Sequence, residues 1–509
     1  MRASYRALPL AAALGVLSST AFAPLSWPGT MVIAVAGLFW LAAELDIARS
    51  RLVIVTGLVY GVSFMGPLIW WMNAVSEGAY VALVLAETVF FAPVMLGLRA
   101  VMRLSWWPVL APAVWVAGEW ARGTMPFHGF PWGRLAHTAV DTPFAAYARL
   151  LGMTGTSVVL ALLAAGLVLI LRGAGPRLRW SAAGGLVALT LVAVALPVGI
   201  ARPGATLQVA LVQGDVPGEF LTWPRGEIFT LHEIETQRLV QRISAGEAPR
   251  PDVVLWPENA TDIDPNFDAG VRARIEGLSR ELDAPILVGG IFDGPTVDTA
   301  YNAGVVWTEN GPGDRYVKRR PVPYGEYVPF RRSLGGIVPR FDRDIPRDML
   351  AGDLPGGLHI GGAILGDTIC YDIAYDGVVA DALGTGAQAL VVQTSNAAFT
   401  RTAQPEQQWD ISRMRAIETG RWVLVPSTNG ISGVIDPQGR AVQRAPMHEP
   451  ATIEQKITLA DGSTPSRAIG PIVTWVFVTL GLAGVAFGLV IGWRARTRRV
   501  WTRRSRGDR

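Results

Sequence analysis

Long apolar segments recur through the first 200 residues and constrain the fold more than any other feature of the chain. A helix needs about 20 residues to cross the hydrocarbon core of a bilayer, which is about 30 Å thick. Windows of this kind predict spans at 8–24, 28–43, 52–72, 79–98, 106–121, 151–171, 180–200 and 471–493. A single cleaved signal peptide does not explain so many segments. The sequence therefore predicts a membrane domain over 1–200 with seven transmembrane helices, and an eighth helix at 471–493.

The composition agrees with this interpretation. Charged residues make up 17% of the chain, below the roughly 25% that soluble domains carry. This excludes a disordered chain, a small disulfide scaffold and an ordinary cytosolic enzyme. Cys370 is the single cysteine, so no intramolecular disulfide forms.

The arginines in the short loops predict the orientation in the membrane, because basic residues collect on the cytoplasmic side. With a cytoplasmic N-terminus, the inside segments carry Arg2, Arg6, Arg49, Arg51, Arg99, Arg103, Arg172, Arg177 and Arg179, and the outside loops carry Arg122, Arg134 and Arg149. We therefore expect both termini in the cytoplasm and 201–470 on the extracytoplasmic side of the cytoplasmic membrane. The basic tail at 494–509 is then the inner flank of the last helix, and no nucleic-acid partner is expected.

A polar loop rich in Pro, Gly and aromatic residues follows the fifth predicted span, at 122–150. Phe127, Phe130 and Trp132 in this loop are typical of an interfacial belt at headgroup depth. The same loop is equally suited to form a wall of a lipid entry path. The residues alone leave both interpretations open.

Short β-type runs begin after Arg202 and alternate with helical patterns, which predicts a layered α/β domain over 201–470. The expected strands are 207–213, 252–257, 285–292, 303–308, 359–370, 389–395 and 422–428. The expected helices include one with Val271, Ile275, Leu278 and Leu282 on its apolar face, and one at 407–419 that Gly420 ends. Asn429-Gly430 is a hairpin signal, so part of the sheet should be antiparallel.

Three reactive side chains each follow an apolar run: Glu258 after VVLWP, Lys318 in RYVKRR and Cys370 at the end of AILGDTIC. Functional groups gather beyond the carboxyl ends of strands in α/β sheets, so we expect these three to meet. Only Lys318 and Lys456 are lysines among 45 basic residues. Lys318 lies among arginines, which suggests that its position needs a compact ammonium, for example to stabilise an oxyanion. The alternative is that Lys318 is a chance lysine at a solvated edge.

Cys370 is open to two interpretations. A free cysteine is ordinarily a small buried hydrophobe, but this one precedes a predicted helix start whose N–H groups would stabilise a thiolate. With Glu258 taking the thiol proton and Lys318 stabilising the oxyanion, the three residues form an acyl-transfer set without histidine. We find no metal-ligand spacing, P-loop or GxGxxG after a strand, so no metal and no cofactor are expected.

Three motifs resemble one known superfamily. WPENA around Glu258, VKRRPVPYGEYVPFR around Lys318 and ICYD around Cys370 are similar to the Glu-Lys-Cys signatures of the nitrilase, or carbon–nitrogen hydrolase, superfamily. The eight-span frame with an inserted domain resembles the membrane branch of that superfamily, the apolipoprotein N-acyltransferases. The likeness covers nearly the whole chain.

The resemblance implies a nitrilase-like α-β-β-α sandwich and a two-step reaction. Cys370 would accept an acyl chain from a phospholipid as a thioester, and the N-terminal amine of a diacylglyceryl-cysteine on an apolipoprotein would then receive it. Glu258 matches the general base, Lys318 the oxyanion-stabilising lysine and Cys370 the nucleophile. Glu326, Tyr371, Asn302 and Trp223 match supporting positions. Without the resemblance, Glu326 would be interpreted as a surface partner of Arg331 or Arg332.

The chain departs from the family pattern at two places. Asp372 stands where the family commonly has glutamate, so its supporting role depends on a shorter reach. The segment SNAAFT at 395–400 lacks the acidic residue and the tryptophan that are usual there. Acyl-chain or acceptor preference would differ while the core chemistry is kept.

Two other functions remain open from the sequence. A membrane-held amidase or nitrilase would use the same triad with water as the second nucleophile. A transporter or receptor would use the outer domain only to bind a ligand, with Glu44, Glu87 and Glu119 as its candidate intramembrane charges. Replacing Cys370 with alanine should abolish either enzyme and leave transport or binding intact.

Overall fold

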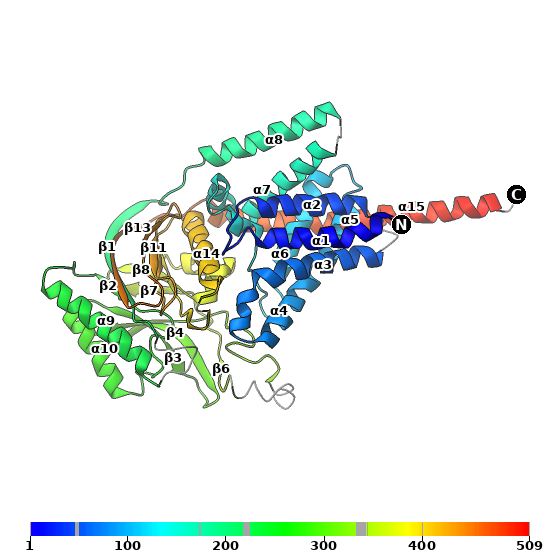
Figure 1. Cartoon of the computed structure of the whole chain (residues 1–509). Coiled ribbons are helices and arrows are strands. Elements are labelled where there is room, and N and C mark those ends of the chain that lie inside the picture. Colours follow the sequence, from blue (N-terminus) through cyan, green and yellow to red (C-terminus); the bar gives the residue numbers. More distant parts are fainter. Residues whose placement is uncertain are drawn as a thin grey trace. The chain divides into compact units, whose positions relative to one another are not determined.

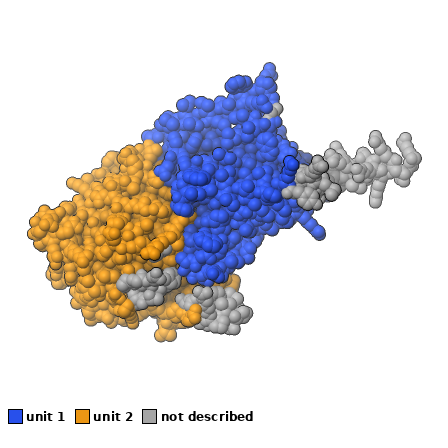
Figure 2. Space-filling view, in the orientation of Figure 1, with its two compact units in different colours: residues 1–197, 465–509 blue, residues 198–464 orange. Residues whose placement is uncertain are grey.

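The computed structural model describes residues 2–45, 50–172, 175–216, 224–331, 343, 345–399 and 401–507. The chain divides into two compact units, which Figure 2 colours separately. Unit 1 comprises Met1–Pro197 and Pro465–Arg509, and unit 2 comprises Val198–Thr464.

Unit 1 is helical (Figure 1). Its helices are α1 (Arg2–Ser19), α2 (Thr30–Glu44), α3 (Ser50–Leu68), α4 (Glu77–Val89), α5 (Phe91–Val101), α6 (Trp107–Arg122), α7 (Ala146–Leu171), α8 (Pro176–Ala195) and α15 (Ser466–Gly507). Within the described ranges, five stretches are long and apolar enough to cross a membrane, namely Ser50–Leu68, Glu77–Val101, Pro143–Leu171, Pro176–Ala195 and Ser466–Arg494. Arg6–Ser19 and Thr30–Glu44 are shorter apolar helices. These helices agree with a multi-pass membrane unit, and the number of eight spans stays a prediction.

A buried ion pair joins α4 to α6 inside unit 1. Arg122 Nη1 lies 2.9 Å from Glu87 Oε2, and both side chains are nearly inaccessible to solvent. The same Nη1 donates to the carbonyl oxygen of Phe130, which holds the loop after α6. Charges within a membrane helix are usually paired in this way, so Glu87 has a structural explanation that needs no transported ligand.

The loop after α6 packs into unit 1. Trp132 is 2% exposed, and its ring lies 5.8 Å from that of Trp71 and is stacked on Phe130. Phe127 is 38% exposed. Because Phe130 and Trp132 are buried within the protein, they do not form the headgroup belt that was one of the two interpretations.

The described residues of unit 2 form two β-sheets. One follows the order β13 (Ala451–Ala460), β1 (Pro203–Gln213), β2 (Val253–Leu255), β3 (Ile286–Asp293), β4 (Thr299–Thr308), β5 (Gly311–Val317), with β6 (Asp348–Met349) paired to β4. The other follows the order β12 (Ala441–Arg444), β11 (Gly433–Ile435), β10 (Val423–Val425), β9 (Ala389–Gln393), β8 (Ala363–Ile369), β7 (Gly357–Ile360). The pairs β1–β2, β2–β3, β8–β9 and β9–β10 are parallel.

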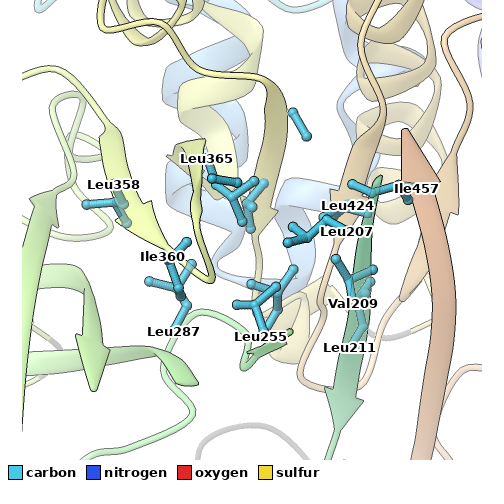
Figure 3. Packing of buried hydrophobic residues seen from close by; sticks show 14 of the residues in the cluster. Leu207, Val209, Leu211, Leu255, Leu287, Leu358, Ile360, Leu365, Leu424 and Ile457 are labelled. Atoms are coloured by element: carbon cyan, nitrogen blue, oxygen red, sulfur yellow. The ribbon is translucent and has the colours of Figure 1, made fainter. Parts of the chain in front are cut away.

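The two sheets pack face to face through aliphatic side chains (Figure 3). Leu207 and Val209 of β1 and Leu255 of β2 contribute from one sheet, and Ile360 and Leu365 contribute from the other. Burying such side chains stabilises the fold by roughly 1.5–3 kcal/mol each. This layer is therefore the core that fixes the spacing between the sheets.

Helices cover the outer faces of both sheets, which completes four layers in the order α-β-β-α (Figure 1). Helices α9 (Glu227–Ser244) and α10 (Ala269–Leu282) pack on the first sheet, and α13 (Asp376–Gly384) and α14 (Gln404–Thr419) pack on the second. The Asp268 side chain caps α10 by accepting from Gly270 N and Val271 N at 2.9 Å. Gly420 ends α14 with φ +60°, as the sequence predicts.

Two strand predictions have clear outcomes. β10 and β11 pair antiparallel, which confirms the hairpin expected around Asn429-Gly430. The single strand expected at 359–370 is wrong, because this run forms the antiparallel pair β7 and β8. Gly361 and Gly362 between them have φ +58° and +77° and make the tight turn that a continuous strand would not contain.

Candidate active site

The three predicted reactive residues all follow strand ends in unit 2. Glu258 comes three residues after β2, Lys318 directly follows β5, and Cys370 directly follows β8. Lys318 N donates to the Asn302 carbonyl oxygen at 2.9 Å, which extends the β4–β5 ladder by one bond. Glu258 and Lys318 are in contact at 3.2 Å, and the charges of both act on the Cys370 thiol.

Glu258 is buried, with 4% of the residue exposed. Its Oε1 accepts from Asn302 Nδ2 at 2.7 Å and from Lys318 Nζ at 3.2 Å. Its Oε2 accepts from the backbone N–H of Ser395 at 2.9 Å. These donors satisfy both carboxylate oxygens and hold the group in one orientation.

Lys318 lies between two carboxylates. Its Nζ donates to Glu326 Oε1 at 2.9 Å as well as to Glu258, and the residue is 2% exposed. Burial lowers the pKa of Lys318, but the charges of Glu258 and Glu326 outweigh burial and raise this pKa well above its ordinary value. The lysine therefore rests as an ammonium.

Glu326 and Asn302 complete this network. Asn302 Nδ2 donates to Glu326 Oε1 at 3.0 Å, and Glu326 Oε2 accepts from Val322 N at 2.7 Å. Arg331 pairs with Asp348 at 2.7 Å, and Arg332 lies outside the described residues. Among the described residues, the ion-pair partner of Glu326 is the buried lysine.

Cys370 opens a short 3₁₀ turn, η5 (Cys370–Ala374), and has a φ of +51°. Burial, and next the charge of Glu258, raise the pKa of the Cys370 thiol to about 12, and Lys318 acts in the opposite direction. The expectation of a thiolate stabilised by a helix start is therefore wrong. Cys370 rests as a neutral thiol and needs a base to become a nucleophile.

The chain turns sharply at three positions around the site. Asn259, Cys370 and Asn396 have φ of +56°, +51° and +55°. Left-handed backbone is uncommon for residues other than glycine and collects at functional sites, where packing fixes it. Cys370 is the least expected of the three, because asparagine tolerates this conformation better.

Asp372 has a clear contact set despite its short side chain. Its Oδ2 accepts from the Tyr316 hydroxyl at 2.6 Å and from Arg319 N at 3.3 Å, and its Oδ1 accepts from Arg320 N at 3.1 Å. The carboxylate thus ties the turn after Cys370 to the segment after Lys318. The side chain of Asp372 is therefore long enough to make these contacts, although it is shorter than the glutamate that is common in the family.

Two predicted supporting residues remain, Tyr371 and Trp223. Tyr371 packs edge-on against Tyr375 with ring centroids 5.0 Å apart. Trp223 lies outside the described residues.

Arg415 is a site residue that sequence reasoning missed. It is fully buried on α14, and it donates to the carbonyl oxygens of Ile373 and Ala374 in η5 at 2.9 Å each. Its charge is balanced by Asp376 at 2.8 Å and Glu418 at 2.6 Å. An arginine within a helical pattern gives no signal of such a contact, because its partners are backbone atoms of another element.

A buried carboxylate, an ammonium and a thiol are the groups that covalent acyl transfer requires. The family model of the carbon–nitrogen hydrolases matches residues 210–464, so unit 2 has the fold of that class. A second family model, the apolipoprotein N-acyltransferase N-terminal domain, matches residues 14–166.

Relatives extend the match along nearly the whole chain. An apolipoprotein N-acyltransferase of Mycolicibacterium smegmatis is 34% identical, over 94% of this chain and 84% of its own. That of Methylococcus capsulatus is 30% identical, over 95% of this chain and 96% of its own. Among solved structures, a variant of the amidase from Nesterenkonia sp. AN1 aligns with 17% identity and a TM-score of 0.34, over 49% of this chain and 92% of its own. This chain belongs to the apolipoprotein N-acyltransferase family.

Proposed function

We propose that the chain transfers a fatty acyl group from a membrane phospholipid, through a thioester on Cys370, to the N-terminal amine of a diacylglyceryl-cysteine on an apolipoprotein. The observation that carries the proposal is the Glu258–Lys318 pair in unit 2 of a chain whose other unit is apolar and helical. A donor dissolved in the bilayer and an acceptor anchored to it explain why a cysteine catalyst is joined to membrane helices.

In the first step, Glu258 removes the thiol proton and the Cys370 sulfur attacks the ester carbonyl of the phospholipid. The Lys318 ammonium stabilises the negative oxygen of the tetrahedral intermediate, because Glu258 and Glu326 keep it charged. The carbon–oxygen bond breaks, and Glu258 returns its proton to the departing lysophospholipid oxygen. The acyl group remains as a thioester.

In the second step, the acceptor amine attacks the thioester carbonyl and loses a proton to Glu258. The carbon–sulfur bond breaks as the amide forms, and the proton returns to the sulfur. Asn302, Glu326 and Asp372 act by positioning, since each contacts Glu258, Lys318 or the backbone around them. The residues that bond to substrate atoms are Cys370, Glu258 and Lys318.

The topology belongs to the same proposal. Eight spans would be formed by α1, α2, α3, α4 with α5, α6, α7, α8 and α15. The basic residues of the predicted inside loops and of the tail support cytoplasmic termini and an extracytoplasmic catalytic domain between residues 201 and 470. Val297 is 97% exposed in unit 2, so a Val297→Cys change in a Cys370→Ala chain should react with an impermeant maleimide in intact spheroplasts. A reaction only after lysis would contradict this orientation.

The direct test of the function uses purified protein, phospholipid and a synthetic diacylated lipopeptide with a free N-terminal amine. The proposal predicts a triacylated peptide whose third chain is on the amine, and none with the Cys370→Ala variant. Release of free fatty acid without peptide acylation would favour a hydrolase that uses the same triad.

A further inference from the structure

A buried carboxyl group lies close to the active site and takes no part in the proposed chemistry. Asp367 is on β8, three residues before Cys370, and is fully buried. Neither of its carboxyl oxygens has a hydrogen-bond partner among the residues that the structure describes. The Oε1 of Gln393, at the end of β9, also has none within that part of the chain.

Asp367 Oδ2 and Gln393 Oε1 both lie close to one glycine of the opposite sheet. A Cβ built on Gly304 of β4 would lie 2.3 Å from Asp367 Oδ2 and 2.3 Å from Gln393 Oε1. Only glycine leaves room for both groups there. If Asp367 were ionised, its Oδ2 and Gln393 Oε1 would be two acceptor oxygens in this space, which is costly in a protein interior.

A proton on Asp367 would remove the conflict, because the carboxyl O–H would then be a donor facing Gln393 Oε1. The other end of the same amide, Gln393 Nε2, donates to the Trp256 carbonyl oxygen at 2.6 Å. Trp256 lies two residues before Glu258. The residue two positions after Gln393 is Ser395, whose N–H donates to Glu258 Oε2. The Gln393 amide therefore joins both strand ends that hold Glu258.

The groups that face Asp367 agree with a neutral acid. Burial raises the pKa of Asp367 well above its ordinary value, the charges of Asp372 and Glu258 add to this, and the Thr368 backbone N–H opposes it. Tyr316 on β5 also interacts with Asp367. These side-chain neighbours are all acids, so deprotonation would add like charge to the site.

We propose that Asp367 is a positioning residue that remains protonated in the working enzyme and orients the Gln393 amide, which in turn holds the strand end that carries Glu258. The inference rests on the proposed role of Glu258 as the base. A neutral Asp367 also leaves the thiol of Cys370 without a further negative charge nearby.

Two substitutions of similar size test the proposal. In Asp367→Asn the amide N–H₂ replaces the carboxyl donor, so acylation of Cys370 by phospholipid should remain close to the wild-type rate. In Asp367→Leu the Gln393 oxygen has no donor, and the rate should fall about tenfold or more. A wild-type rate in Asp367→Leu would overturn the proposal.

The pH dependence of Cys370 alkylation is the second readout. If Asp367 is neutral, Asp367→Asn removes no charge and the profile stays where it is. If Asp367 is ionised, the substitution removes a negative charge, the thiol pKa falls, and alkylation at a given pH becomes faster. That shift would contradict the proposal.

Infrared difference spectroscopy tests the protonation state even where the leucine variant fails to fold. The spectrum of wild type minus Asp367→Asn, in an ester-free detergent at neutral pH, should contain the carbonyl band of a protonated carboxyl group. A carboxylate band in its place would overturn the proposal. Because this readout needs no lipid substrate, it separates a failure of the Asp367 assignment from a failure of the proposed function.

Discussion

Glu326 Oε1 lies 2.9 Å from Lys318 Nζ, so the lysine that we propose to be catalytic is paired with a glutamate from the loop that follows it. This pair is independent of Glu258, whose own contact with the lysine is longer, at 3.2 Å. Glu258 is thereby able to accept a proton while Lys318 keeps a carboxylate partner. Glu326 therefore holds the Lys318 ammonium, which leaves Glu258 free to act as the proposed base.

Replacing Glu258 with glutamine should slow thioester formation by roughly 10²- to 10⁴-fold, the usual contribution of a general base. Glutamine keeps the size of the side chain but takes no proton from a thiol whose pKa is raised to about 12. The rate is measured as lysophospholipid release from wild type and variant. The matched control is Glu281→Gln, an exposed position on α10, which should keep the wild-type rate. An active Glu258→Gln enzyme would exclude Glu258 as the base.

Alkylation of Cys370 should be slow at neutral pH and should rise about tenfold per pH unit, because only the thiolate reacts. The sign follows from burial and Glu258, which disfavour the thiolate and raise the thiol pKa to about 12. An unperturbed thiol, with a pKa of about 8.5, would instead level off above about pH 9. Iodoacetamide uptake reports Cys370 alone, since it is the single cysteine, and Cys370→Ala should take up none. A plateau near pH 9 would contradict a Cys370 thiol with a raised pKa.

Replacing Asp372 with glutamate should destabilise unit 2 by about 1–3 kcal/mol, the usual cost of an extra methylene in a packed interior. Asp372 is fully buried, and its present length fits the Tyr316 hydroxyl and two backbone N–H groups. Thermal unfolding measures the change, and Asp353→Glu at an exposed position is the control. Unchanged stability in Asp372→Glu would mean that the site has room for the longer side chain.

Removing either partner of the Glu87–Arg122 pair should destabilise unit 1 by about 3–5 kcal/mol, because the remaining charge stays buried. We expect the double variant Glu87→Gln, Arg122→Gln to lose less stability than the sum of the single variants. Unfolding in detergent, measured for all four proteins, gives the coupling energy. Additive losses would show that the two side chains act independently.

The sequence predicted the parts of the site that depend on strand ends. Glu258, Lys318 and Cys370 each close an apolar run, and they follow the ends of β2, β5 and β8 in the two sheets of unit 2. The apolar face of α10 also followed directly from its periodicity. These features are local patterns whose consequence in space is nearly fixed by the geometry of a sheet.

Contacts between elements distant in the sequence could not be predicted in this way. Arg415 reaches η5 from a helix, and Gln393 meets Asp367 only because Gly304 lies opposite them. The single strand expected at 359–370 missed the turn between β7 and β8, because apolar residues lie on both sides of Gly361-Gly362 and the turn signal of the two glycines was outweighed. The raised pKa of Cys370 is a property of burial, which the expected helix start did not reveal.

The most direct test of the central claim is the intact mass of the purified protein after incubation with mixed phospholipids, beside the Cys370→Ala variant. The account predicts a fatty-acyl adduct on wild type that maps to Cys370 and is removed by hydroxylamine, and no adduct on the variant. A folded wild-type protein whose Cys370 reacts with iodoacetamide but never gains an acyl group would contradict it.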